Sequence, residues 1–151
     1  MHRLELKIPP ALVAAVIAAG MWLVSYTLPA FAYTRLPFLT VGLGCAGFVI
    51  IGLAMLWFWM EHTTVNPMKP SSASSLVTSG IYAHTRNPMY LGAVLILASW
   101  ALYLANALAL LFLPAFILYM NQFQIKPEER ALTARFGREY VEYMAQVHRW
   151  I

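Results

Sequence analysis

The chain has little charge and almost no cysteine. Only 11% of its 151 residues are charged, 61% are hydrophobic, and the mean hydropathy is +0.65. A soluble domain needs more polar surface than this composition supplies, so we expect an integral membrane protein. The length allows one compact membrane domain, residues 1–151, and we expect no separate soluble catalytic domain.

The single cysteine restricts the chemistry further. Cys45 lies within an apolar segment, and one cysteine excludes both an intramolecular disulfide and a cysteine-rich metal site. We expect it to be a small packing residue. His84 has no partner at helical spacing, because His62 lies across a loop, so we predict no metal site.

Long apolar segments fill the first part of the chain. Residues 9–32 and 38–60 are each long enough to cross a hydrocarbon core of about 30 Å. The basic residues before the first segment, with Ala30-Phe31-Ala32, also resemble a signal peptide and its cleavage site. The segment is long for a signal peptide, so we interpret it as a retained span.

The second span contains a literal G-x-G-x-x-G pattern from Gly42 to Gly47. A dinucleotide fingerprint needs a preceding strand and a tight turn into a helix. An uninterrupted apolar segment in a membrane must instead stay helical to satisfy its backbone. We therefore interpret Gly42, Gly47 and Gly52 as positions of close helix packing.

The polar character changes after the second span. Residues 61–87 are rich in proline, serine and polar side chains, which predicts a loop. Residues 88–124 are apolar and too long for one span, so we predict a helical hairpin that turns near Ala105-Asn106. Pro114 is expected to kink its second arm.

The tail has the pattern of an amphipathic helix. Lys126-Pro127-Glu128-Glu129 predicts a helix start, and we expect a C-terminal helix over 127–148 that Gly137 breaks or bends. One face carries Leu132, Phe136, Tyr140, Tyr143 and Val147, which we interpret as packing residues. Arg149 and Trp150 are interpreted as anchors at the membrane interface. The fold class is therefore all-α, with about four transmembrane helices and this amphipathic helix.

The basic residues indicate the orientation. With four crossings, every lysine and arginine except Arg35 falls on the side that holds both termini and the 61–87 loop. The positive-inside rule places that side in the cytoplasm. Because topology accounts for the net charge of +4, we expect no nucleic-acid partner.

One polar stretch stands at the threshold of the hairpin. His84, Arg86, Asn87 and Tyr90 lie together there, and such groups are costly at membrane depth unless they are paired or bound. The stretch is therefore a candidate functional site.

This stretch and the tail together resemble a known family. GIYAHTRNPMYLG, followed by EERALTARFGREYVEYMAQVHRWI, resembles the isoprenylcysteine carboxyl methyltransferase family and its phospholipid N-methyltransferase relatives over residues 66–151. The combined pattern R-(H/N)-P-x-Y-x-G plus E-E-x-x-L-x-x-x-F-G-x-E-Y is more specific than either half. The resemblance implies an S-adenosyl-L-methionine site between the hairpin and the C-terminal helix, without a Rossmann domain.

The resemblance also implies particular site residues. Arg86 and Glu128 are candidates for catalysis, as is His84, which could accept a proton from an amine substrate. A carboxylate suits the ammonium of S-adenosylmethionine, and an arginine suits its carboxylate. The implied cofactor-binding residues are Leu76, Val77, Tyr82, Asn87, Pro88, Met89, Tyr90, Glu128 and Glu129.

Two departures from the family leave the acceptor open. Asn87 stands where the carboxyl methyltransferases usually have histidine, and Gln124 stands about where they have an arginine thought to meet the substrate carboxylate. We therefore expect a lipophilic small molecule or lipid that accepts the methyl group on a thiol, amine, carboxylate or hydroxyl. The chain is a minimal version of the family pattern, which favours a bacterial inner membrane with the active site in the cytoplasm.

Two other classes remain as alternatives. Membrane sterol-type reductases that use NADPH look similar in this region, but they tend to carry an acidic residue where this chain has Ala93. The second alternative is a non-catalytic scaffold protein that has kept the fold. Binding of a nucleotide-like ligand distinguishes them.

Overall fold

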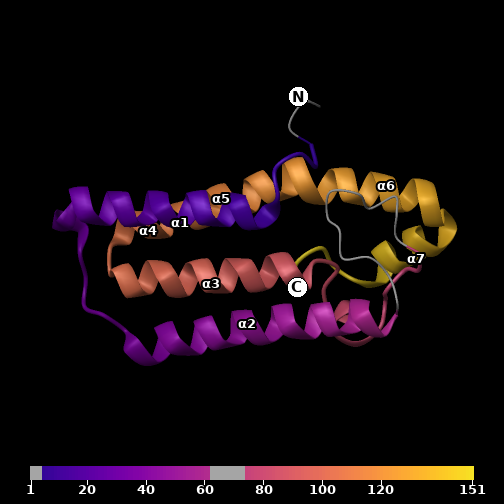
Figure 1. Ribbon diagram of the computed structural model, residues 1–151, viewed down its shortest axis with the longest axis horizontal. Helices are drawn as coiled ribbons and strands as arrows, with labels where there is room; N and C mark the ends of the chain where they lie inside the picture. The colour runs from indigo at the N-terminus through magenta and orange to yellow at the C-terminus, as the bar shows by residue number, and fades with distance from the viewer. Residues whose placement is uncertain (1–4, 62–73) are drawn as a thin grey trace.

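The computed structural model describes residues 5–61 and 74–151, and these contain helices and no β-strand. Four helical segments run side by side (Figure 1). Three helices are long and apolar enough to cross a membrane, and α3 is a shorter apolar helix, so the predicted all-α membrane fold is confirmed. The four segments are α1 (Pro10–Thr27), α2 (Pro37–Met60), α3 (Pro88–Leu104), and α4 (Ala107–Leu110) with α5 (Phe112–Met120).

Prolines set the starts of the first three helices. Pro10, Pro37 and Pro88 each occupy the first helical position, where a proline costs no hydrogen bond. α1 ends at Thr27, earlier than the predicted 9–32 span, because Pro29 opens a short 3-10 turn, η1 (Pro29–Phe31).

α2 and α3 pack backbone to backbone at two glycines. A Cβ atom added at Gly47 would lie 2.7 Å from the Gly92 carbonyl oxygen, and one at Gly92 would lie 2.7 Å from the Gly47 oxygen. The packing interpretation is confirmed for Gly47. It is wrong for Gly42 and Gly52, since a Cβ at either position would meet nothing within 4 Å. Cys45 is also exposed rather than packed.

The hairpin turns where the sequence predicts. α3 ends at Leu104, Ala105 adopts a left-handed conformation with φ of 51°, and the Asn106 side chain accepts a hydrogen bond from the Leu108 N–H at 3.0 Å. The second arm is interrupted at Leu111, because Pro114 has no N–H to donate to the carbonyl four residues earlier.

The tail helix begins at Lys126, where the Lys126-Pro127-Glu128-Glu129 pattern predicts a start, but it is continuous with the second arm of the hairpin. A π-helical segment, η4 (Asn121–Ile125), joins α5 to α6 (Lys126–Phe136), and one helical run extends over Ala107–Phe136. Pro127 cannot donate to the Phe123 carbonyl within this run. That carbonyl instead accepts from the Leu6 N–H at 3.0 Å, so the N-terminal segment compensates for the proline.

The run is longer than a bilayer core. At 1.5 Å per residue its 30 residues span about 45 Å, against a hydrocarbon thickness of about 30 Å. Within this run, every charged residue follows Gln124. α6 is therefore the part of the run that extends beyond the membrane-spanning segment. Figure 1 shows α6 reaching past the end of the bundle.

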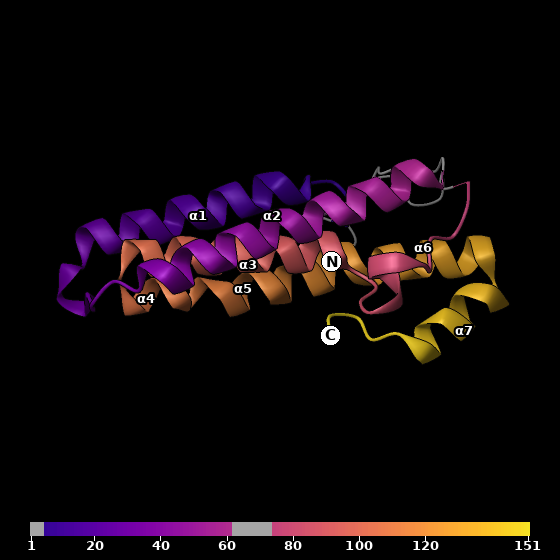
Figure 2. The ribbon, with the colours of Figure 1, turned by 90° about the horizontal axis from the view of Figure 1, so that it is seen from below.

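Gly137 ends α6, as predicted, with a φ of 57°. α7 (Arg138–Gln146) then turns back beneath α6 (Figure 2). The described part of the predicted 61–87 loop contains a 3-10 turn, η3 (Gly80–Ala83), whereas residues 62–73 lie outside the described residues. The start of α1, η3, α6 and α7 all lie at the same end of the bundle (Figure 1).

Candidate functional site

A cavity of about 690 Å³ lies at this end of the bundle. Arg86 lines it, and His84 is exposed and does not. The structure therefore gathers residues from the α2–α3 connection, α3, α6 and α7 around one space. Every residue predicted to bind the cofactor is in its lining: Leu76, Val77, Tyr82, Asn87, Pro88, Met89, Tyr90, Glu128 and Glu129.

The two adjacent acids have different surroundings. The Tyr90 hydroxyl donates to Glu128 Oε1 at 2.5 Å, and Glu128 Oε2 has no hydrogen-bond partner among the described residues. Burial of the Glu128 carboxyl raises its pKa to about 8, the hydrogen bond from Tyr90 opposes that rise, and the nearby Glu129 carboxylate adds to it. Glu128 therefore presents one unused acceptor at the cavity wall.

Glu129 is occupied by two arginines. Its Oε1 accepts from Arg149 Nε at 3.0 Å and lies 3.1 Å from Arg86 Nη2, and its Oε2 accepts from Arg149 Nη2 at 2.7 Å. Arg149 thus binds Glu129 through two guanidinium nitrogens, whereas Arg86 contacts Glu129 through one.

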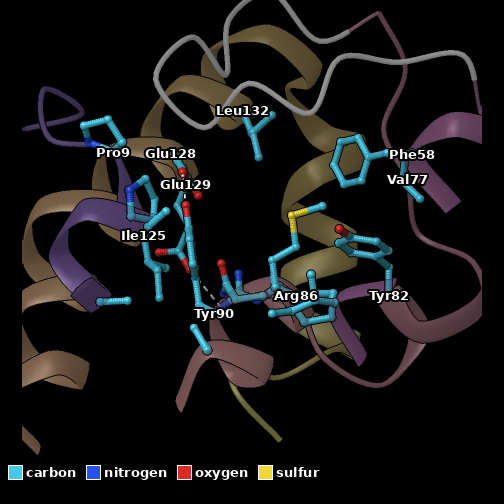
Figure 3. Close-up of a pocket in the computed structure, with 18 of the residues that line it drawn as sticks. Pro9, Phe58, Val77, Tyr82, Arg86, Tyr90, Ile125, Glu128, Glu129 and Leu132 are labelled. Carbon is cyan, nitrogen blue, oxygen red and sulfur yellow. Dashed lines mark hydrogen bonds and ion pairs between the residues drawn. The ribbon is translucent and has the colours of Figure 1, made fainter. Parts of the chain in front are cut away.

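Arg86 keeps two buried donors unused. Its side chain exposes only 10% of its surface, and neither Nε nor Nη1 has a hydrogen-bond partner within the described part of the chain. Unpaired buried guanidinium donors are costly, so they mark a place where an anionic group would be favoured. In Figure 3 Arg86 lies at the base of the cavity between Tyr90 and Tyr82.

The opposite wall is aromatic and apolar. Phe58 and Tyr82 meet edge to face with ring centroids 5.3 Å apart, and Val77 packs beside them (Figure 3). The Tyr143 hydroxyl of α7 donates to the Tyr82 carbonyl at 2.6 Å. Burial raises the pKa of both tyrosines, so both hydroxyls stay neutral.

Residues after α7 close one side of the site. The Arg86 N–H donates to the His148 carbonyl at 3.1 Å, and Asn87 Nδ2 donates to the Arg149 carbonyl at 2.9 Å. Trp150 Nε1 donates to Asn121 Oδ1 at 3.2 Å. The end of the chain is therefore fixed against the first turn of α3.

The N-terminal segment closes another side. Gln124 is fully buried and donates from Nε2 to the Ile8 carbonyl at 2.6 Å, and Arg130 pairs with Glu5. Gln124 does not line the cavity, whereas Pro9 and Pro10 do. Beyond them the cavity continues along small and aliphatic side chains of α1, α2 and α3, among them Ala11, Ala14, Ala18, Ile51, Ala93, Ile96 and Leu97.

The sequence interpretation missed Arg149 and the α1 wall. Arg149 stands 20 positions after Glu129, beyond the helix break at Gly137, so no helical spacing connects the two. The α1 alanines carry no polar signal. Only the fold brings the α1 alanines to the cavity and Arg149 to Glu129 behind it.

Comparisons with known proteins identify the family of the chain. A family model described as phospholipid methyltransferase matches residues 36–139, which include Arg86, Glu128 and Glu129 but neither α1 nor Arg149. An uncharacterized protein of Haemophilus influenzae is 51% identical over 63 residues, which are 42% of this chain and the whole of that protein.

Proposed function

This chain belongs to the phospholipid methyltransferase family of membrane methyltransferases, which includes isoprenylcysteine carboxyl methyltransferase-like proteins, and from that premise we propose that it uses S-adenosyl-L-methionine to methylate a lipophilic acceptor. One observation carries the proposal: the residues that the resemblance implies for the cofactor line a single cavity. The cavity volume of about 690 Å³ lies within the usual range of small-molecule pockets, about 300–1,000 Å³.

The chemistry of the lining supports this cofactor. The unused Glu128 oxygen suits an ammonium, and the two free donors of Arg86 suit a carboxylate. Phe58, Tyr82 and Met89 offer flat or polarizable surfaces to an adenine ring. S-adenosylmethionine, when bound, supplies an electrophilic methyl group on a sulfonium sulfur.

The protein's own part is to position the reactants and exclude water. The segments at both ends of the chain wall the cavity, and such enclosure strengthens the charged contacts inside it. We assign no role to His84, because it is exposed and outside the lining. The acceptor atom stays open among thiol, amine, carboxylate and hydroxyl.

The apolar extension of the cavity supports a lipophilic acceptor. Its walls come from Ala14 and Ala18 of α1, Ile51 of α2, and Ala93 and Leu97 of α3. A hydrocarbon chain could lie there while its reactive group faces the charged end. The orientation that we propose, with the charged end in the cytoplasm of a bacterial cell, follows from the distribution of basic residues.

Loss of the charged contacts tests the site. In membranes that contain Arg86→Ala or Glu128→Ala, incorporation of labelled methyl from S-adenosylmethionine into extracted lipophilic products should fall by about 10- to 100-fold, because each variant removes charged hydrogen bonds. Thermal unfolding should confirm that both variants fold. Arg138→Ala is the matched control, since its pair with Glu142 is exposed. Incorporation at the wild-type level by both site variants would contradict the assignment of Arg86 and Glu128 to the site.

A further inference from the structure

Arg86 and Glu129 could form a tighter pair than the one observed. An arginine and a carboxylate prefer two parallel hydrogen bonds. Glu129 exposes only 15% of its side chain and is already in contact with Arg86 Nη2 at 3.1 Å. Released from its other contacts, this carboxylate would be free to pair with a second Arg86 nitrogen, and Nε and Nη1 are both buried without a partner among the described residues.

Arg149 occupies the carboxylate in a way that prevents this. Its Nε and Nη2 contact the two oxygens of Glu129 separately, at 3.0 and 2.7 Å. Each oxygen of Glu129 therefore already accepts from Arg149, and Oε1 is shared with Arg86, so Arg149 competes with Arg86 for the carboxylate. The Nε and Nη1 groups of Arg86 stay without a partner among the described residues as a result.

The position of Arg149 is itself fixed from the site. Its carbonyl accepts from Asn87 Nδ2 at 2.9 Å, and the carbonyl of the preceding residue accepts from the Arg86 N–H at 3.1 Å. The backbone before α3 and the guanidinium that grips Glu129 are therefore linked through two adjacent residues. A change at Arg149 would therefore reach Arg86 through a continuous path of hydrogen bonds and ion pairs.

We propose that Arg149 is a positioning residue of the cofactor site: it holds Glu129 in a fork, and so keeps two donors of Arg86 free for the carboxylate of the ligand. The inference rests on the proposed function and adds to it a residue outside the span that the family model matches. Arg149 does not line the cavity, so its effect is exerted through Glu129.

The test is the affinity for S-adenosylhomocysteine, measured by calorimetry on the full chain in detergent. Arg149→Ala should weaken binding by about tenfold or more, because Glu129 then competes for Arg86. Arg149→Lys should lose less, since lysine keeps the charge but not the fork. Arg138→Ala removes an equal charge from an exposed pair and should bind as wild type does.

A double-mutant cycle separates positioning from simple docking of the tail. In a Glu129→Gln background no carboxylate competes for Arg86, so Arg149→Ala should cause no further loss of affinity. An equal loss in both backgrounds, or wild-type affinity in Arg149→Ala, would overturn the inference. If Arg149→Ala does not fold, the losses of affinity caused by Arg149→Lys in the two backgrounds are compared instead. Failure of the wild-type protein to bind would instead contradict the proposed function, and the inference with it.

Discussion

At the scale of single residues, two adjacent glutamates do different work. Glu129 is held by Arg86 and Arg149 through both of its oxygens, whereas Glu128 has one hydrogen bond and one free oxygen. The resemblance singles out Glu128 as the catalytic candidate, but the contacts that distinguish the two acids come from Arg149 and Tyr90, which lie on other elements. We assign the ammonium of the ligand to Glu128.

This assignment predicts a pH-dependent affinity. The pKa of Glu128 is raised to about 8, mainly by burial, so the carboxyl must lose a proton before it can pair with an ammonium. Affinity for S-adenosylhomocysteine should therefore rise by about tenfold or more between pH 6.5 and 8.5. Calorimetric titration at several pH values in that interval measures the effect.

Glu128→Gln is the control for that profile. The ligand's own amino group titrates equally with both proteins, so only the wild-type dependence should disappear from the variant. The stability of the ligand-free protein should change with pH in the opposite direction to the affinity. The pKa of Glu128 in the folded protein lies above its usual 4.5, so the stability that this group contributes is fully present below pH 4.5 and is lost as pH rises through about 8. Identical pH profiles for the two proteins would contradict the role of Glu128.

At the scale of helices, the sequence predicts the spans and the hairpin well because apolar length and proline positions are local signals. The sequence does not predict that the tail helix continues directly from the hairpin, because a π-helical segment and the Leu6 N–H together accommodate Pro127. Gly42 and Gly52 are misassigned for a similar reason, since composition shows that a glycine is present but not which face of α2 meets α3.

The glycines of α2 give a matched prediction. Gly47→Ala should destabilise the protein by about 1–3 kcal/mol, because its Cβ would lie 2.7 Å from the backbone of α3. Gly52→Ala, in the same helix with open space around it, should be neutral or stabilise by up to about 1 kcal/mol. Thermal unfolding of both variants in detergent checks this. Equal effects would contradict the observed contact.

At the scale of the whole molecule, the chemistry is gathered at one end. The charged residues of the site come from segments far apart in the sequence, and they meet because the residues before α3, the start of α6 and the residues after α7 lie at the same end of the bundle (Figure 1). The distribution of basic residues predicts this arrangement from the sequence. It cannot predict the depth of each side chain, which the packing of α6 and α7 determines.

The same asymmetry predicts the orientation in a bacterial inner membrane. In a Cys45→Ser background, a membrane-impermeant thiol reagent applied from outside the inner membrane should label Arg35→Cys but not Lys7→Cys, although both positions are exposed. Opening the membrane should make Lys7→Cys reactive. Labelling of Lys7→Cys alone before opening would reverse the proposed topology.

The central claim is that the cavity binds S-adenosylmethionine, and thermal unfolding of the detergent-purified protein with S-adenosylhomocysteine tests it most directly. A ligand at a hundred times its dissociation constant should add about 2.7 kcal/mol of stability, while NADPH at equal concentration should add none. Stabilisation by the homocysteine compound alone is the predicted result. Stabilisation by NADPH alone, or by neither ligand, would contradict the account.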